Sequence, residues 1–346
     1  MKILAVGDSY MPPRYFAEAF AGLEAGHEVV YRQVDPDRSF EPATPSERAL
    51  REYQGAPEEV ASWMAGVEVL VVQGAPVTDA VLGASSALKL VCCARGGPVN
   101  IDVEAVSARG LPLVNTPGKN AEAVADLTLA FLVILARGLR RAERFLEDGH
   151  RLRDNWEGAR FMGSDLRRHV LGLVGYGQIG SRVARRALAF DLQVLAFDPY
   201  VRLSDADVEQ VETLDELLAR ADFVSLHARA TADNRHLIDE AALQRMKDGA
   251  FLVNTAREAL VDEQALDAAL ESGRLAGAAL DVVEHGGEDG KPHFLLRHDN
   301  VVLTPHLGGA THETLLQGAE MIAEEIQRFA AGQPLRHVVN RPAAAA

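Results

Sequence analysis

Arg257 and His306 are two side chains in the second half of the chain whose chemistry suits proton transfer beside a carboxylate. Imidazole titrates near neutral pH, so His306 can take a proton from a hydroxyl group or return it. The guanidinium of Arg257 is permanently charged and forked, which suits the carboxylate of a 2-oxo acid. Hydride removal from a secondary alcohol needs both functions, together with a nicotinamide held against them.

A glycine-rich turn at residues 171–180 predicts where such a nicotinamide cofactor binds. An apolar run there breaks into G-x-G-x-x-G, formed by Gly175, Gly177 and Gly180. In a dinucleotide-binding βαβ unit these glycines allow a tight turn, close approach of backbone to pyrophosphate, and tight helix–strand packing. Asp198 ends the next strand-like run, where an acid accepts hydrogen bonds from the adenosine ribose and repels a 2′-phosphate. The pattern therefore predicts NAD.

A second candidate ligand site follows the apolar run at residues 90–94, where Arg95 precedes Gly96 and Gly97. Glycines at the carboxyl end of a parallel strand expose backbone N–H groups at the edge where α/β sheets bind ligands. A guanidinium there can bind an anion with two parallel hydrogen bonds. The segment predicts a small anionic substrate, and the alternative is a simple strand-to-loop turn with a solvated arginine.

The elements that position these residues alternate between strand and helix along the chain. In the first part, strands are expected at residues 2–6, 28–31, 67–72, 89–93 and 113–114, with helices at 14–25 and 57–65. After the glycine-rich turn, strands are expected at 192–197, 223–227, 250–254, 277–281 and 301–306, with helices at 214–220, 240–246 and 263–271. Such alternation predicts two α/β domains with parallel sheets.

Three further segments link these domains. Residues 121–141 are apolar nearly all round, so we expect a helix buried between domains or against another subunit. Residues 146–164 are polar and aromatic and predict an arm rather than a domain. Residues 311–330 predict a long helix that carries the chain back to the first domain.

Composition excludes several classes of partner. The 346 residues are 48% hydrophobic, enough for two buried cores, and carry a formal charge of −15. That charge, without a basic stripe, argues against a nucleic-acid partner. There is no signal-peptide pattern and no run long enough to span a bilayer, so we expect a cytoplasmic protein with no membrane partner. Cys92 and Cys93 predict buried thiols rather than a disulfide or a metal site.

Several sequence blocks together resemble the D-isomer-specific 2-hydroxyacid dehydrogenase family, which includes phosphoglycerate, glyoxylate and hydroxypyruvate reductases. The blocks are residues 95–97, 115–118, 175–180, 254–257, 280–282 and 304–311. The resemblance implies a Rossmann cofactor domain, residues 120–310, inserted into a flavodoxin-like substrate domain of residues 1–119 and 311–346. It also implies a homodimer joined largely through the helix at 121–141 and the arm that follows.

The resemblance gives Arg257 and His306 the substrate-binding and acid–base roles that their chemistry suggests. Arg95, Gly96 and Gly97 are the expected substrate-binding residues. The expected cofactor-binding residues are Thr116, Gly175, Gly177, Gln178, Ile179, Gly180, Asp198, His227, Ala228, Thr255, Ala256, Asp281 and Gly308.

Two positions depart from the family pattern. Glu258 follows Arg257 where the family usually has glycine, which adds a negative charge beside the substrate arginine. The carboxylate that pairs with the catalytic histidine usually lies five residues past the aspartate matching Asp281, where this chain has Gly286. Either Glu288 supplies it after a local insertion, or Glu284 does, or it is missing, and we favour Glu288.

The leading hypothesis is an NAD-dependent oxidoreductase that interconverts a D-2-hydroxy acid and its 2-oxo acid. Phosphoglycerate-, glyoxylate- and hydroxypyruvate-type substrates remain open, as does the physiological direction. The alternative is a protein similar to NAD-sensing co-repressors, which bind dinucleotide without turnover.

Overall fold

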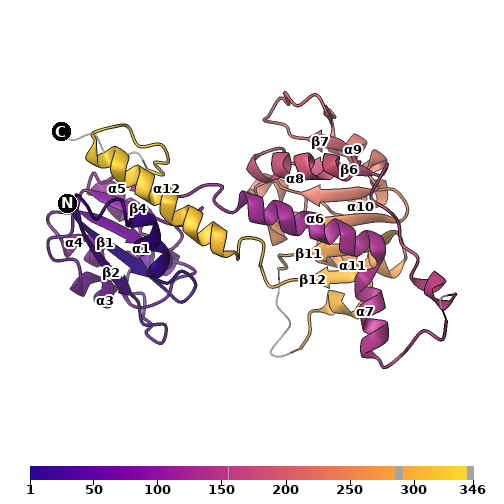
Figure 1. Ribbon diagram of the computed structural model, residues 1–346, viewed down its shortest axis with the longest axis horizontal. Coiled ribbons are helices and arrows are strands. Elements are labelled where there is room, and N and C mark those ends of the chain that lie inside the picture. Colours follow the sequence, from indigo (N-terminus) through magenta and orange to yellow (C-terminus); the bar gives the residue numbers. More distant parts are fainter. Residues whose placement is uncertain (155, 285–290, 341–346) are drawn as a thin grey trace. The chain divides into compact units, whose positions relative to one another are not determined.

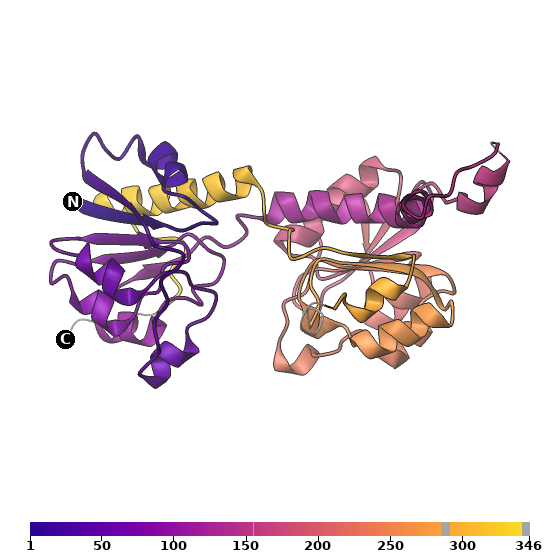
Figure 2. The ribbon, with the colours of Figure 1, turned by 90° about the horizontal axis from the view of Figure 1, so that it is seen from below.

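The computed structural model describes residues 1–154, 156–284 and 291–340. The chain forms two compact units, one from Met1–Lys119 with Thr311–Ala346 and the other from Asn120–Ala310. Each unit is built on one fully parallel sheet with helices on both faces (Figures 1 and 2). The predicted fold class, two doubly wound α/β domains, is confirmed.

The sheet of the first unit has the strand order β2-β1-β3-β4-β5, the order of flavodoxin-like folds. All residues of β3 and β4 are buried, as expected for short apolar runs covered on both faces. Its strands are β1 Lys2–Gly7, β2 Glu28–Gln33, β3 Val69–Val72, β4 Leu90–Cys93 and β5 Leu113–Val114. Beyond β5, the amide of Val339 donates to Leu113 and the amide of Asn115 to His337, so the end of the chain protects this edge.

Two layers of helix cover the first sheet. Phe16 and Phe20 of α1 pack with Ile322 and Ile326 of α12 on one face, while α3, α4 and α5 cover the other (Figure 2). The predicted helices at 14–25 and 57–65 end earlier than expected, at Phe20 and Ser62. The bounds are α1 Arg14–Phe20, α2 Pro45–Ala49, α3 Pro57–Ser62, α4 Asp79–Gly83, α5 Val103–Ala108 and α12 His312–Ala330.

The sheet of the second unit has the order β12-β11-β10-β9-β6-β7-β8, a Rossmann arrangement with one added strand. Sequence reasoning misses β8 because its Val-Glu-Gln is too short and polar to give a strand signal. The strands are β6 Val170–Val174, β7 Gln193–Phe197, β8 Val208–Gln210, β9 Phe223–Leu226, β10 Ala250–Asn254, β11 Leu275–Leu280 and β12 Val301–Leu303.

Helices α6 and α8 lie side by side over one face of the second sheet (Figure 1), and α9, α10 and α11 cover the other. The α-helices are α6 Ala121–Arg137, α7 Leu139–Glu147, α8 Gln178–Ala189, α9 Leu214–Arg220, α10 Glu240–Arg245 and α11 Glu263–Glu271. The 3-10 helices are η1 Glu157–Phe161, η2 Ala232–Asn234, η3 Glu258–Leu260 and η5 Phe294–Arg297.

The helix predicted at residues 121–141 is shorter than expected. It ends at Arg137 because Gly138 adopts the left-handed conformation, with φ 59°, and α7 then begins in a new direction. Its apolar residues, including Phe131 and Leu132, pack against Leu171 and Leu173 of its own unit. One face of the helix is therefore a layer of the second unit.

Candidate functional site

The parallel register brings the carboxyl ends of the second unit's strands level with one another. Leu226 of β9 is level with Val174 of β6 and with Asn254 of β10. The residues that follow such strand ends therefore lie along one edge, where doubly wound sheets bind ligands. Five residues of the predicted site lie at this edge: Gly175, Asp198, His227, Thr255 and Asp281.

The three motif glycines are needed for three different reasons. Gly175 has φ 99°, and a Cβ there would lie 2.9 Å from the backbone of His227 and Ala228. A Cβ on Gly180 would collide with the carbonyl oxygen of Gly175. A Cβ on Gly177 would meet nothing within 4 Å, so the space in front of this turn is open.

The first turn of α8 differs from those of the helices on the opposite face. Thr213, Asp239 and Asp262 each cap their helix, with a side-chain oxygen that accepts a backbone N–H. The residue before α8 is Gly177, which has no side chain to do so. The N–H groups of Gln178, Ile179 and Gly180 therefore remain available, and a helix N-terminus attracts phosphate.

Asp198 is held by backbone N–H groups on both of its oxygens. One oxygen accepts from the amide of Tyr176 at 2.8 Å, and the other from Tyr200 at 2.9 Å and Val201 at 3.1 Å. A carboxylate offers about four acceptor positions, so one remains for a ribose hydroxyl. Arg202, the nearby residue that could favour a 2′-phosphate, pairs with Glu212 at 3.4 Å.

His227 carries a buried polar atom with no partner among the described residues. Its Nε2 lies 2.9 Å from Ser225 Oγ, while Nδ1 is buried and unpaired. Desolvation by burial lowers the pKa of His227 to about 3, so the ring is neutral at physiological pH. In the first unit, the buried Oγ1 of Thr116 likewise has no partner in the described part of the chain. A buried polar atom without a protein partner in the described residues can be satisfied by a ligand, and at His227 this atom lies at the sheet edge described above.

Arg257 is positioned by Asn254, a residue that sequence reasoning left out of the site. Asn254 is 1% exposed; its Nδ2 donates to the carbonyl of Arg257 at 2.9 Å, and its Oδ1 accepts from the amide of Ala256 at 3.0 Å. The backbone of Arg257 is therefore fixed, while its guanidinium is exposed. A polar residue that ends an otherwise apolar strand was the available signal. Thr255 lies between them, and its Oγ1 is 3.1 Å from that of Thr128.

The loop that carries His306 is organised by the carboxylate of Asp281. This carboxylate accepts from Thr304 Oγ1 and the Leu307 amide, each at 2.6 Å, and from the Gly308 amide at 2.7 Å. The carbonyl of Asp281 accepts from the His306 amide at 3.0 Å. These bonds hold His306 in a left-handed conformation, with φ 58°, that a non-glycine residue rarely adopts.

The structure corrects two predictions about this loop. The last strand ends at Leu303, three residues before His306, because the backbone turns to bind Asp281. Asp281, predicted only to contact the cofactor, also builds the loop of the acid–base residue.

The predicted carboxylate partners of His306 have different outcomes. Glu288 lies outside the described residues, as does Gly286. Glu284 pairs with Arg235 at 2.7 Å and with His236 at 3.6 Å. Over the residues that the structure describes, the ring of His306 has no hydrogen-bond or ion-pair partner.

The described residues on either side of 285–290 are tied to one carboxylate on α11. Glu263 accepts from the amide of Glu284 at 2.6 Å, and its other oxygen lies 3.2 Å from His293 Nε2. The side chains of Glu263 and His293 are each only 6% exposed. Glu284 and His293 are therefore both held by Glu263.

In the first unit, Arg95 is paired within its own domain. Its Nη1 donates to the carbonyl of Glu52 at 2.7 Å, and its Nη2 forms an ion pair with the Glu52 carboxylate. The sequence suggested either an anion clamp or a solvated arginine, and within its own unit this arginine is bound to Glu52. Gly96 and Gly97 are exposed, and a Cβ on either would meet nothing within 4 Å.

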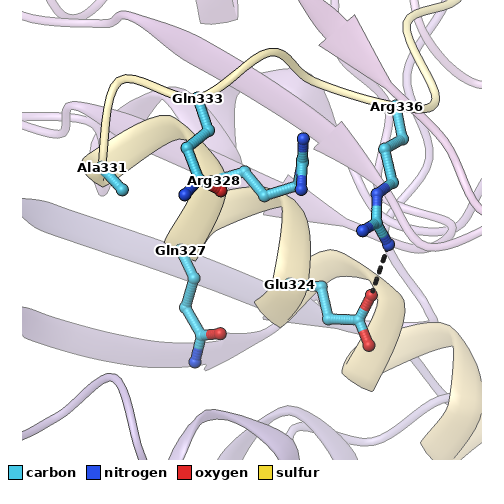
Figure 3. Close-up of a pocket in the computed structure, with 6 residues that line it drawn as sticks. All are labelled: Glu324, Gln327, Arg328, Ala331, Gln333 and Arg336. Carbon is cyan, nitrogen blue, oxygen red and sulfur yellow. Dashed lines mark ion pairs between the residues drawn. The ribbon is translucent and has the colours of Figure 1, made fainter.

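A shallow pocket at the C-terminal end of α12 lies apart from these residues (Figure 3). Arg336 pairs there with Glu324 at 3.6 Å, and Arg328 donates to the carbonyl of Pro334 at 2.7 Å. None of its lining residues belongs to the predicted site: Glu324, Gln327, Arg328, Ala331, Gln333 and Arg336.

The described residues include neither a membrane-spanning helix nor a cluster of metal-ligand side chains. No described helix combines the length and apolar character needed to cross a bilayer. No group of three or more potential ligand residues lies close enough to hold a metal ion, again within the described part of the chain.

Comparisons with known proteins agree with this arrangement. Residues 129–308 match the NAD binding domain of the D-isomer specific 2-hydroxyacid dehydrogenases. The chain is 38% identical over 289 residues to D-3-phosphoglycerate dehydrogenase of Methanocaldococcus jannaschii, covering 82% of this chain and 54% of that one. It is 40% identical over 262 residues to hydroxypyruvate reductase of Thermotoga maritima, covering 75% and 84%.

Among solved structures, D-2-hydroxyisocaproate dehydrogenase superposes with a TM-score of 0.80 at 27% identity, covering 98% of this chain and 99% of that one. The chain spans about half the length of the phosphoglycerate dehydrogenase that it matches. It spans most of the length of the hydroxypyruvate reductase. This chain therefore belongs to the D-isomer specific 2-hydroxyacid dehydrogenase family, and its second unit contains the family's NAD binding domain.

Proposed function

We propose that this protein is an NAD-dependent oxidoreductase that interconverts a D-2-hydroxy acid and its 2-oxo acid. The observation that carries the proposal is the shared sheet edge of the second unit. An open glycine turn, an arginine fixed by Asn254 and a histidine loop built on Asp281 all lie there. Dehydrogenases and reductases of 2-hydroxy acids among the relatives support it.

The second unit would hold the cofactor mainly through its backbone. The N–H groups of Gln178, Ile179 and Gly180 face the open space at Gly177 and suit the pyrophosphate. Asp198 has one acceptor position left for the ribose. When bound, the nicotinamide supplies or accepts the hydride. His227, Ala228, Thr255, Ala256, Asp281 and Gly308, with Thr116 of the first unit, are proposed as the remaining contacts.

His306 and Arg257 would perform the proton transfer and the charge stabilisation. In the reduction, protonated His306 donates its proton to the carbonyl oxygen as this becomes a hydroxyl, and the ring ends neutral. In the oxidation, neutral His306 accepts that proton. Arg257 binds the carboxylate with two hydrogen bonds and polarises the adjacent carbonyl.

Glu288 is our proposed partner for His306, because the Glu284 carboxylate pairs with Arg235 and His236. A carboxylate bonded to the second imidazole nitrogen stabilises the protonated ring, which is the form that donates the proton in the reduction. In Glu288→Gln, reduction should slow at neutral pH and partly recover in acid, while Glu284→Gln should keep the wild-type profile. Equal profiles for all three proteins would show that His306 works without Glu288.

A homodimer is proposed from exposed apolar side chains around α7. Leu146, Trp156 and Met162 are 63%, 87% and 78% exposed. Side chains of this size in one segment mark an interaction surface.

The test is cofactor oxidation by the purified chain with a panel of 2-oxo acids: glyoxylate, hydroxypyruvate, 3-phosphohydroxypyruvate and 2-oxoglutarate. We expect turnover of at least one, with NADH preferred. Tight NADH binding without oxidation on any of them would favour the alternative, a dinucleotide-sensing protein.

A further inference from the structure

The Arg95–Glu52 pair places a carboxylate where a substrate anion was expected. Nη1 donates to the Glu52 carbonyl and Nη2 to the Glu52 carboxylate. The side chain of Arg95 is 18% exposed and that of Glu52 is 68% exposed. Glu52 therefore covers Arg95 from the solvent side.

The backbone around Glu52 is fixed on both sides. The amide of Arg51 donates to the carbonyl of Val99 at 2.9 Å, and that of Gln54 to Gly74 at 3.0 Å. The side chain of Gln54 forms two hydrogen bonds with Ser9, of 2.7 and 2.8 Å.

Aromatic packing and backbone conformation also indicate that residues 52 and 53 are held in place. The ring of Tyr53 packs on that of Phe40 with centroids 5.0 Å apart. Glu52 itself has φ 51°, which a non-glycine residue keeps only when its surroundings hold it. The backbone that carries the Glu52 carboxylate is therefore held in place beside Arg95.

A second carboxylate lies near Arg95. Asp8, at the end of β1, accepts from the amides of Tyr10, Met11 and Gly74 and interacts electrostatically with Arg95. Lys119 donates to the carbonyl of Ala94 at 2.7 Å. Arg95 therefore has two carboxylates, those of Glu52 and Asp8, in its surroundings before any ligand binds.

We propose that Glu52 is a specificity-determining residue that occupies Arg95 and excludes substrates with a second anionic group. This inference rests on the proposed function and names its substrate class: a 2-hydroxy acid whose remainder is uncharged, not a phosphorylated or dicarboxylic acid. A second anion would have to displace a fixed carboxylate or share its site, and both cost free energy through like-charge repulsion. An uncharged remainder bears no such cost.

The experiment compares kcat/KM for hydroxypyruvate and 3-phosphohydroxypyruvate at saturating NADH in the full chain. Wild type should prefer hydroxypyruvate. Glu52→Gln keeps the side-chain size, removes the negative charge, and should shift the ratio toward the phosphorylated acid by about tenfold or more. Glu58→Gln removes one charge from an exposed position in α3 of the same unit and should leave the ratio unchanged. Adding Arg95→Gln to Glu52→Gln should abolish the gain.

A second readout does not depend on turnover. Inorganic phosphate should raise the melting temperature of Glu52→Gln more than that of wild type or Glu58→Gln. The inference is overturned if Glu52→Gln gains neither phosphate stabilisation nor a shifted ratio, or if wild type already prefers the phosphorylated acid. Phosphate stabilisation of Glu52→Gln with no turnover of any 2-oxo acid would support the anion exclusion while contradicting the proposed function.

Discussion

The carboxyl edges of the two sheets are built in different ways, although both sheets are parallel and doubly wound. The edge of the second unit is made of backbone: a glycine turn, an uncapped helix start, and loops tied to Asn254 and Asp281. The edge of the first unit is made of paired charges, chiefly Arg95 with Glu52. A backbone-built edge suits a cofactor with a constant pyrophosphate, whereas paired side chains can set the choice of substrate.

The largest expected effect comes from removing the exposed side chains of the second edge. Arg257→Ala and His306→Ala should each fold normally and lose transition-state stabilisation on the order of 3 kcal/mol, a hundredfold or more in turnover. NADH binding should survive both, as fluorescence titration would show. Arg245→Ala, an exposed arginine that pairs with Asp215 at 3.0 Å, is the matched control. Near-normal turnover in His306→Ala would contradict the proposed mechanism.

The backbone character of the second edge is tested by two glycines of one motif. Gly180→Ala should lower the free energy of unfolding by roughly 1–3 kcal/mol, because its Cβ meets the Gly175 carbonyl. Gly177→Ala should leave stability unchanged, since its Cβ points into open space, but should weaken NADH binding about tenfold. Denaturant unfolding and NADH titration of both variants provide the measurements. Equal loss of stability in the two variants would contradict the assignment of a packing role to Gly180 and a cofactor-binding role to Gly177.

Asp198 is the side chain of the second edge that is expected to set the preference between NADH and NADPH. Wild type should prefer NADH to NADPH, and Asp198→Asn should narrow the ratio of kcat/KM values by about tenfold, because the repulsion of a 2′-phosphate falls. Asp207→Asn removes a charge from an exposed position nearby and should keep the wild-type ratio. A wild-type preference for NADPH would overturn the assignment and implicate Arg202.

The smallest expected effect is a pH dependence of the stability of the first unit. Desolvation by burial lowers the pKa of Lys119 from 10.5 to about 8. The unfolded chain therefore binds more protons between these values, and the stability of the first unit should rise as pH increases from about 8 toward 10.5. Lys119→Met keeps the aliphatic stem but has no titrating group, so its free energy of unfolding should not rise over this range. We expect the difference between the two proteins to be less than about 1 kcal/mol, because the lysine is partly exposed. Melting curves across that range should diverge between the two proteins, and parallel curves would show that Lys119 is ordinarily solvated.

Much of the fold follows from local sequence pattern. Short apolar runs such as residues 69–72 and 90–93 form buried strands because both of their faces need covering. The glycine motif likewise specifies its own turn, since Gly175 needs a positive φ and Gly180 has no room for a Cβ. Arg257 and His306 were predicted from their side-chain chemistry together with their positions after strands and the family motifs around them.

Only the tertiary structure shows which groups are paired. Arg95 and Glu52 are 43 residues apart, and Asp281 binds the Gly308 amide across 27 residues, with no local signal for either contact. The sequence does not show whether an arginine has an ion-pair partner. That partner is determined when folding brings distant strand ends and loops to one sheet edge. The sequence by itself therefore determined which side chains could transfer protons or bind anions, and the packing of the first unit decided that Arg95 pairs with Glu52.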